Sequence, residues 1–302
     1  MNKKLIRRDF TKTLAMAGGA VLLPGKMNAS GPALQAAAPG KYKLSLNAYS
    51  FDKPLRAGSM TISDMLEYCS RQGFDAVDLT GYYFTGYPAV PSDEVIYNVK
   101  RKAFLLGIEI GGTGVRNDFT WADSEKRKVE KQLVKDWVIV AEKLGAPEVR
   151  IFAGNQPQRN IPWDERAKWV ADDVRECAEF GKNHGVMMAL QNHNDFLKTS
   201  EEVEKIMKMI DSDWTGLMLD IGSYHSVDPY ADIAKNVKHA ISWQLKEKVF
   251  VNDNQVDTDY VKVMDIVKRS GYKGYLPLET LGEGDPETKI AALLKRVQDV
   301  LK

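Results

Sequence analysis

Apolar residues recur along this chain with two different spacings, and the two kinds of segment alternate from Lys43 onward. Short, almost continuous apolar runs fit strands that are covered on both faces. Longer segments repeat an apolar residue every three or four positions, as the buried face of a helix does. The short runs predict strands at 44–51, 76–79, 108–110, 149–152, 187–191, 217–219, 241–245 and 275–278, and the longer segments predict helices at 62–72, 95–105, 124–144, 163–184, 203–210, 233–237, 260–267 and 290–301.

Two of the predicted helices carry additional signals. Thr61 and Asp64 have the spacing of a capping box, and Gly73 follows as a residue that ends helices. The helix between Asp123 and Gly145 has the most regular apolar spacing. Its expected buried face consists of Val129, Leu133, Trp137, Val140 and Leu144.

Eight strand–helix units follow one another with short connections and without a break in composition. This succession predicts an α/β fold of one closed parallel barrel, a (β/α)8 TIM barrel, over residues 41–302. The alternative is an open doubly wound sheet, which usually has a glycine-rich phosphate loop after an early strand. The run Gly111-Gly112-Thr113-Gly114 lacks the dinucleotide fingerprint and its acidic partner, so we expect a tight loop or a loop with a close backbone approach there.

The amino-terminal segment predicts export. Arg7, Arg8, Phe10 and Lys12 form a twin-arginine type pattern, and the mildly apolar stretch 13–23 that follows is too short to span a bilayer. We expect residues 1–29 to be a signal that is removed on export to the periplasm and residues 30–40 to be a linker. No stable membrane insertion is expected after removal, and an uncleaved anchor is the alternative.

Charge and cysteine content exclude several classes. Residues 1–26 hold six basic residues against one acidic residue, a net +5, which leaves −4 for the rest of a chain whose total is +1. The expected barrel therefore has no basic excess that would indicate nucleic acid binding. Cys69 and Cys177 stand at apolar positions of predicted helices and are expected to be small buried hydrophobes.

Polar side chains stand where the predicted strands end, and the carboxyl ends of barrel strands converge on one mouth. Gln191 and His193 share one face of their strand because side chains alternate, although both could simply hydrogen-bond neighbouring loops. The other strand-end candidates are Asn47, Tyr49, Asp78, Thr113, Asn117, Arg150, Phe152, Asp220, Gln244, Lys246 and Glu279.

Asp220 and Glu279 come directly after the apolar runs 217–219 and 276–278. A carboxylate at the end of a buried strand needs a partner, because burying an unpaired charge is costly. That partner is a metal ion or, alternatively, the side chain of Arg150 or Lys246.

With these residues, the chain from about 41 to 302 resembles the xylose isomerase-like sugar phosphate isomerase/epimerase family. Its members are TIM barrels that hold a divalent metal at the mouth through Glu, Asp, His and Glu at the ends of the fifth to eighth strands. The resemblance is carried by Leu190-Gln191-Asn192-His193, Leu219-Asp220-Ile221-Gly222, Gln244-Leu245-Lys246-Glu247 and Leu278-Glu279-Thr280.

The resemblance implies that Gln191, Asp220, Gln244 and Glu279 are the metal ligands of this chain. Two of them depart from the family pattern, since Gln191 replaces a Glu and Gln244 replaces a His. Carboxylate and amide oxygens suit Mg²⁺, Ca²⁺ or Mn²⁺ rather than zinc, and we expect Mn²⁺ or Mg²⁺. His193 could complete the ligand set, act as a base or only hydrogen-bond.

Epimerases of the family use two glutamates as bases, and of that pair this chain keeps only Glu279, because Gln191 cannot take a proton. We expect an exported sugar isomerase/epimerase-like enzyme that uses metal-assisted proton abstraction next to a sugar carbonyl. Glu279 is the expected base, Lys246 the electrostatic partner of the oxyanion and His193 a further catalytic candidate. The expected carbohydrate contacts are Asn47, Tyr49, Asp78, Arg150, Phe152 and Trp243.

Other functions stay open. A lyase that acts on 3-keto-glycosides also needs one base, and a carbohydrate-binding barrel without catalysis fits the two amides. An AP endonuclease, whose barrel is similar, would need a histidine-rich zinc site, and the chain has four histidines in total. An oxidoreductase would need a nucleotide fingerprint.

Overall fold

Eight parallel strands close into a barrel in the computed structural model, which describes residues 42–155, 160–193 and 195–302. The strands are β1 (Lys43–Asn47), β2 (Ala76–Thr80), β3 (Glu109–Gly114), β4 (Glu148–Phe152), β5 (Met187–Gln191), β6 (Thr215–Asp220), β8 (Ala240–Lys246) and β11 (Tyr275–Glu279). Their order around the barrel is β1-β11-β8-β6-β5-β4-β3-β2, so barrel strands that follow one another in the sequence are neighbours in space. The predicted TIM barrel is confirmed, whereas the predicted signal and linker lie outside the described residues.

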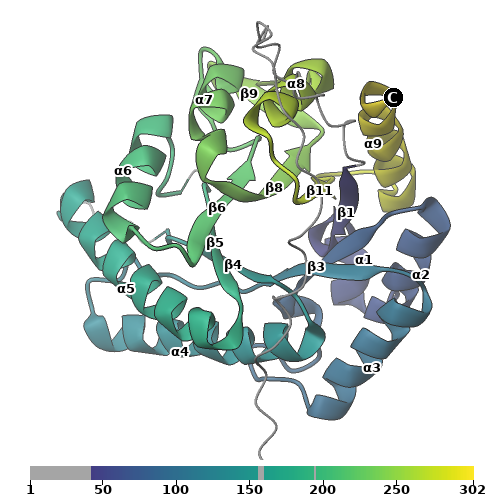
Figure 1. Cartoon of the computed structure of the whole chain (residues 1–302), viewed down its shortest axis with the longest axis horizontal. Coiled ribbons are helices and arrows are strands. Elements are labelled where there is room, and N and C mark those ends of the chain that lie inside the picture. The colour runs from purple at the N-terminus through teal and green to yellow at the C-terminus, as the bar shows by residue number, and fades with distance from the viewer. Residues whose placement is uncertain (1–41, 156–159, 194) are drawn as a thin grey trace, which may run out of the picture. The chain divides into compact units, whose positions relative to one another are not determined.

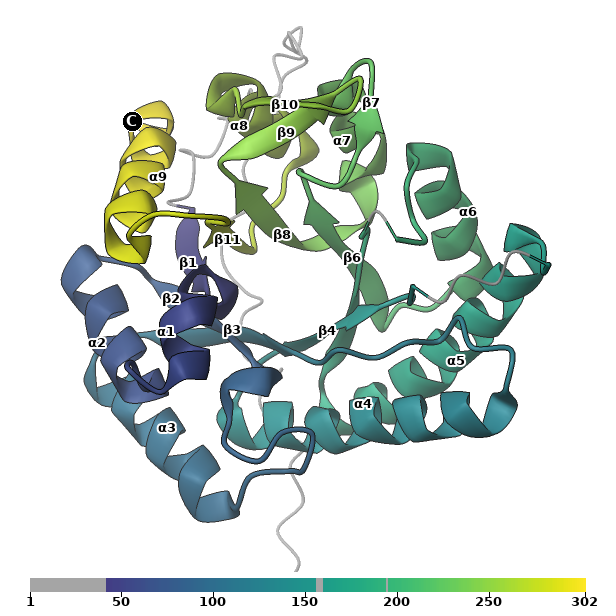
Figure 2. The ribbon, with the colours of Figure 1, turned by 180° about the vertical axis from the view of Figure 1, so that it is seen from behind.

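Helices follow the strands and surround the barrel (Figure 1, and from behind in Figure 2). The outer ring consists of α2 (Ile62–Gln72), α3 (Asp93–Leu105), α4 (Ser124–Leu144), α5 (Trp163–His184), α6 (Ser200–Ile210), α7 (Pro229–Asn236), α8 (Tyr260–Ser270) and α9 (Pro286–Leu301). Shorter helical segments are η1 (Ala48–Phe51), α1 (Asp52–Ala57), η2 (Gly81–Tyr83) and η3 (Val237–His239). No helix in the described part of the chain is long and apolar enough to cross a membrane.

Helix ends agree with the sequence signals. Thr61 and Asp64 form the capping box of α2, and Gly73 ends this helix with φ +77°. In α4, Trp137 and Leu144 are buried as predicted. Val129 is not, since 69% of its surface is exposed, so the buried face of α4 begins about one turn later than the sequence pattern indicated.

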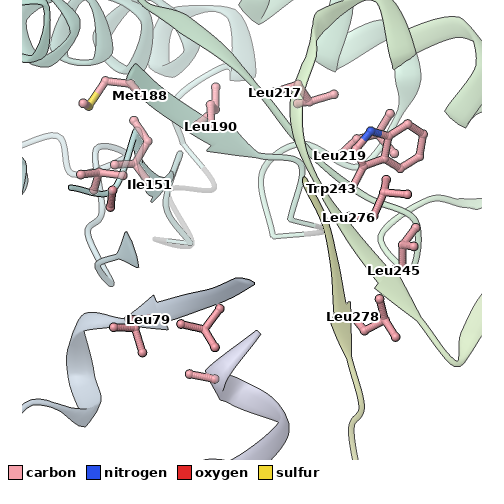
Figure 3. Close-up of a cluster of buried hydrophobic side chains, with 14 of the residues drawn as sticks. Leu79, Ile151, Met188, Leu190, Leu217, Leu219, Trp243, Leu245, Leu276 and Leu278 are labelled. Carbon is pink, nitrogen blue, oxygen red and sulfur yellow. The ribbon is translucent and has the colours of Figure 1, made fainter. Parts of the chain in front are cut away.

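Side chains alternate between the two surfaces of the barrel wall. Leu190 on β5, Leu217 and Leu219 on β6, and Leu276 and Leu278 on β11 are fully buried in the hydrophobic core. Figure 3 shows this apolar cluster, which includes side chains from several strands. The polar residues that alternate with these leucines, such as Gln191, Asp220 and Glu279, therefore lie on the inner surface of the barrel.

The prediction of a loop at 111–114 is wrong, because these residues belong to strand β3. Their glycines make room inside the barrel rather than a turn. A Cβ on Gly112 would lie 3.1 Å from Oε1 of Glu148, and one on Gly114 would lie 3.0 Å from Nε of Arg150. Large ionisable side chains of β4 occupy the space that the glycines leave.

A second, three-stranded sheet was not predicted. It consists of β7 (His225–Ser226), β9 (Lys248–Val251) and β10 (Asn254–Asp257), and its strands follow the carboxyl ends of β6 and β8 in the chain. Asn252 and Asp253 connect β9 to β10 with φ values of 49° and 63°. Positive φ at both residues suits a two-residue hairpin, so this Asn-Asp pair was the available signal for the hairpin.

Candidate functional site

A cavity of about 450 Å³ opens at the carboxyl ends of the barrel strands. Most of the residues that the sequence predicted for the site line this cavity. They are Asn47, Tyr49, Arg150, Phe152, Gln191, His193, Gln244, Lys246 and Glu279.

The register of the sheet brings the central positions together. Asp220 on β6 pairs with Gln244 on β8, and Lys246 on β8 pairs with Glu279 on β11. Gln191 on β5 lies beside β6. Residues far apart in the sequence therefore become lateral neighbours on the inner surface of the barrel.

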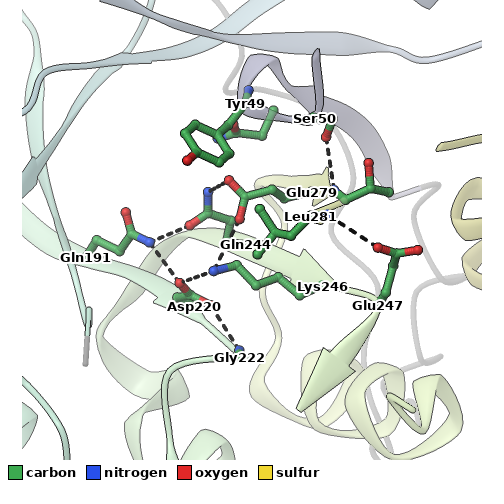
Figure 4. A network of polar contacts seen from close by, with 12 residues as sticks. Tyr49, Ser50, Gln191, Asp220, Gly222, Gln244, Lys246, Glu247, Glu279 and Leu281 are labelled. Atoms are coloured by element: carbon green, nitrogen blue, oxygen red, sulfur yellow. Dashed lines mark hydrogen bonds and ion pairs between the residues drawn. The ribbon is translucent and has the colours of Figure 1, made fainter. Parts of the chain in front are cut away.

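These side chains form a closed ring of hydrogen bonds and ion pairs (Figure 4). The Lys246 ammonium donates to Oδ2 of Asp220 at 2.7 Å and lies 3.2 Å from Oε2 of Glu279. Gln191 Nε2 donates to the same Asp220 oxygen at 2.8 Å and to Oε1 of Gln244 at 2.6 Å. Gln244 Nε2 donates to Oε1 of Glu279 at 2.7 Å, which completes the ring.

Asp220 is fully buried, and backbone and side-chain contacts fix its position. Gly222 N donates to Oδ1 of Asp220 at 2.9 Å. Asn192 accepts from the Asp220 amide at 2.8 Å and donates to its carbonyl at 3.0 Å. Asp220 therefore does not line the cavity itself but anchors the side chains that do.

Burial and charge act in opposite directions on the two carboxylates. Burial is the largest single effect on Asp220 and raises its pKa, but the charge and hydrogen bond of Lys246, the charge of His193 and the hydrogen bond from Gln191 together outweigh burial and hold this pKa below its usual value. For Glu279 burial dominates, and its pKa is raised despite Lys246. Burial lowers the pKa of Lys246, yet the charges of Asp220 and Glu279 outweigh burial and raise it, so the lysine stays protonated. Glu279 is thus the more basic carboxylate, beside a permanent cation.

Arg150 also lines the cavity. Its guanidinium donates to the Val115 carbonyl and to the Tyr82 hydroxyl, each at 2.6 Å, and lies 4.2 Å from the centre of the Phe152 ring. The aromatic neighbours provide flat apolar surface and the guanidinium provides positive charge, a combination that suits a polyhydroxylated ligand.

His193 stands at the rim and is paired with Asp195. Its Nδ1 lies 2.8 Å from Oδ2 of Asp195, and its ring meets the edge of Phe152 with 5.2 Å between the ring centres. Both His193 and Asp195 line the cavity. The His193 ring thus lies between Asp195 and Phe152 at the edge of the cavity.

Two predicted carbohydrate contacts do not line the cavity. Trp243 is fully buried in the hydrophobic core and packs edge-on against Tyr272, because it alternates with Gln244 and so faces the opposite surface of the barrel wall. Asp78 lies inside the barrel, where its Oδ2 accepts from Asn47 Nδ2 at 2.7 Å. Burial raises the pKa of Asp78 to about 6.

Part of the cavity wall was not predicted from the sequence. It comes mainly from the connection between β3 and α4 and from residues after β4, which follow no apolar period. The polar cluster Arg116-Asn117-Asp118 after β3 was the available signal, and only Asn117 was predicted. The lining residues that were missed are Arg116, Asp118, Trp121, Glu130, Gly154, Asn155, Asp195 and Leu281.

The side chains at the four family ligand positions are not arranged to hold a divalent cation, although their oxygens are of a suitable type. The two carboxylates are bridged by Lys246, and each glutamine directs its NH₂ group, not its oxygen, toward a carboxylate. The part of the chain that the structure describes contains no group of three or more His, Cys, Asp and Glu side chains that could hold a metal ion. The arrangement of these side chains therefore departs from the metal site that the resemblance implied.

Comparison with solved structures supports the fold over almost the whole barrel. D-psicose 3-epimerase from Clostridium cellulolyticum H10, solved with D-tagatose, is 18% identical with a TM-score of 0.72, and the match covers 86% of this chain and 99% of that one. 3-keto-D-glucoside 4-epimerase from E. coli is 14% identical with a TM-score of 0.69, and the match covers 86% of this chain and 100% of that one. The IolI protein with a bound zinc atom is 17% identical with a TM-score of 0.68, and the match covers 86% of this chain and 96% of that one.

No curated protein matches the sequence. The family model described as xylose isomerase-like TIM barrel matches residues 66–300, which is most of the chain and includes every residue of the hydrogen-bonded ring. The chain therefore belongs to the xylose isomerase-like TIM barrel family.

Proposed function

We propose that this chain is a sugar isomerase/epimerase-like enzyme that removes a proton from the carbon next to a sugar carbonyl, with Glu279 as the base. The observation that carries this proposal is the position of Glu279. It lines the cavity at the barrel mouth, has a raised pKa and lies 3.2 Å from the Lys246 ammonium. The solved relatives that act on sugars by epimerisation support the substrate class.

The residues of this site divide the chemistry between a base and a cation. The proton passes from the substrate carbon to a carboxylate oxygen of Glu279, and the electrons of the broken C–H bond move onto the carbonyl oxygen. The resulting enediolate is stabilised by the Lys246 ammonium, which keeps its proton while it is paired with two carboxylates. Return of the proton to the former carbonyl carbon, with transfer of the hydroxyl proton on the adjacent carbon to the enediolate oxygen, moves the carbonyl and completes an isomerisation.

The walls of the cavity suit a carbohydrate. Tyr49 and Phe152 offer aromatic surface, and Asn47, Arg150 and Gln191 offer polar groups to hydroxyls. We also propose that the barrel works in the periplasm after twin-arginine export. That location favours glycosides over phosphorylated sugars, which are cytoplasmic metabolites.

A second function is favoured by the single carboxylate base. Gln191 stands at the position of the family's other glutamate and cannot take a proton. After Glu279 removes the proton, the carbonyl re-forms from the enediolate oxygen, a C=C bond forms toward the anomeric carbon, and the glycosidic C–O bond breaks while the departing oxygen takes a proton from His193 at the rim. Such a β-elimination on a 3-keto-glycoside would make the chain a lyase.

Deuterium exchange tests both functions together. Purified protein is incubated with a 3-keto-glucoside or a ketohexose in deuterated buffer, and loss of the proton signal next to the carbonyl is followed by NMR. Wild type should exchange this proton, and Glu279→Gln should reduce the rate by roughly 10²–10⁴-fold, as loss of a positioned base does. Product analysis then separates a rearranged sugar from an eliminated one.

A matched variant controls for the substitution itself. Glu283→Gln makes the same change at an exposed carboxylate that pairs with Lys53, so exchange should be unaffected. Sugar binding without any exchange in wild type would rule out the enzyme and leave a carbohydrate-binding barrel. Full activity of Glu279→Gln would remove Glu279 from the role of base.

A further inference from the structure

We infer that the Lys246 ammonium takes the place of the divalent cation in this barrel, so that the site works without a resident metal. The catalytic part of this inference rests on the proposed function. Metal content and stability test the rest independently.

The first support is the position of the ammonium. It contacts one oxygen of each of the two carboxylates that the family pattern assigns to the metal, Asp220 at 2.7 Å and Glu279 at 3.2 Å. Only 13% of the Lys246 side chain is exposed, and Asp220 is completely buried. A divalent cation bridging the same two oxygens would have to displace this lysine.

The second support is the shape around the lysine stem. A Cβ on Gly222 would lie 2.8 Å from Cδ of Lys246, so the glycine leaves a groove that the stem fills. The carbonyl of Lys246 accepts from the Thr258 hydroxyl at 2.7 Å and from the Tyr260 hydroxyl at 2.6 Å. The fold therefore holds Lys246 at both its backbone and its stem, as it would hold a fixed part of the site.

The third support is the balance of charge and hydrogen bonds. One ammonium faces two carboxylates, and the two glutamines add no charge. Gln191 and Gln244 fill the two ligand positions at which the family has Glu and His, and in this ring both act as donors to the carboxylates. Turning either amide to offer its oxygen to a metal would withdraw its NH₂ group from a carboxylate and break the ring. The two amides and the lysine thus satisfy the carboxylates without a metal.

For catalysis, this inference means that the Lys246 ammonium, and not a metal ion, polarises the substrate carbonyl. A positive charge that is part of the chain meets the carbonyl oxygen of the substrate, and it cannot be removed by a chelator. Exchange activity should survive EDTA and dialysis without loss.

The experiment compares wild type with Lys246→Met in the full barrel. Metal content is measured after incubation with Mn²⁺ and desalting, and Tm is measured with Mn²⁺ and with EDTA. Wild type should carry far less than one metal per chain, and its Tm should move by less than about 1 °C between the two conditions, because a ligand stabilises only the state that it binds. Lys246→Met leaves two buried carboxylates without a cation, so its Tm should fall by several degrees and rise again with Mn²⁺.

Lys248→Met is the matched control. It makes the same change two residues away, at a lysine that pairs with Asp257 on the surface, and should leave Tm insensitive to Mn²⁺. One tightly bound metal per wild-type chain, with a Tm that falls in EDTA, would overturn the inference. A Lys246→Met protein that is as stable as wild type and ignores Mn²⁺ would overturn the assignment to Lys246.

The measurements on wild type stand even when Lys246→Met does not fold. They also stand when no sugar is turned over, so a failure of the proposed reaction is distinguishable from a failure of this inference.

Discussion

Glu148 allows a quantitative test of the barrel interior beneath the site. This glutamate begins β4, is 7% exposed and lies against the backbone of Gly112. Burial raises its pKa from 4.5 to about 8, a hydrogen bond with Ser242 lowers it, and the charge of Asp78 raises it. We predict that Glu148→Gln makes the protein more stable at alkaline pH and leaves it nearly unchanged at pH 5.

The sign follows from the direction of the shift. Between pH 4.5 and about 8 the folded state holds a proton on Glu148 that the unfolded state has lost, so the free energy of unfolding falls as pH rises through this window. The rise in the pKa of Glu148 from 4.5 to about 8 corresponds to roughly 5 kcal/mol of free energy of unfolding lost across this window, at about 1.4 kcal/mol for each tenfold change in proton affinity. Glutamine has nearly the same shape and no charge to bury, so it escapes this loss. We expect a gain of roughly 3–5 kcal/mol at pH 9.

Denaturant unfolding at pH 5, 7 and 9 measures this difference. Asp78 titrates in both proteins, and because its charge raises the pKa of Glu148, the difference between the two curves reports Glu148 together with its coupling to Asp78. Glu109→Gln is the control, since Glu109 is half exposed and its pKa is lowered by hydrogen bonds from Lys43 and Tyr275. Glu109→Gln should lower the free energy of unfolding by less than about 1 kcal/mol. Because the pKa of Glu109 is lowered, this small loss should be present at high pH and disappear in acid, the opposite of the change expected for Glu148→Gln. A difference between wild type and Glu148→Gln that stays constant from pH 5 to 9 would refute the assignment of a buried, protonated carboxyl.

Two further predictions concern Gly222 and the amino terminus. Gly222→Ala should push the Lys246 stem out of its groove, lower the exchange rate and cost about 1–3 kcal/mol of stability, as overpacking does. In a Lys246→Ala background the same change should cost much less, and equal costs in both backgrounds would contradict the proposed contact. Replacing Arg7 and Arg8 together by Lys should leave an uncleaved precursor in the cytoplasm, which cell fractionation and mass spectrometry would detect; processed periplasmic protein from this variant would exclude the twin-arginine route.

The barrel could be predicted from the sequence because its signals are local and repeated. Short apolar runs and helical periods recur eight times, and the clearest boundaries, such as the ends of α5 at Trp163 and His184, were predicted to the residue. Strand β3 was missed at its glycines because these residues make room for side chains of another strand, Glu148 and Arg150, which no local pattern contains.

The site could be predicted in part for a different reason. Strand ends converge in any parallel barrel, so the order of strands along the chain is enough to bring Gln191, Gln244, Lys246 and Glu279 together. The prediction that Trp243 contacts the carbohydrate is wrong because it ignored the alternation of side chains along a strand. Trp243 precedes Gln244 directly, and strand alternation places two consecutive residues on opposite surfaces, so only one of them could face the cavity.

The role of Lys246 depends on its neighbours and not on its own position. Lys246 stands in Gln244-Leu245-Lys246-Glu247, one of the segments that carry the resemblance to the metal-binding family, so Lys246 by itself does not distinguish this chain from metal-binding relatives. What differs is Gln191 and Gln244, which remove one negative charge and one imidazole and add two amide donors. With these changes the remaining carboxylates, Asp220 and Glu279, are matched by a buried ammonium and two amides instead of a divalent ion. The ring residues therefore form one coupled set, and restoring Glu at 191 together with His at 244 should let the site hold a metal even with Lys246 in place, because the two amide donors that keep the ammonium matched to the carboxylates are then gone.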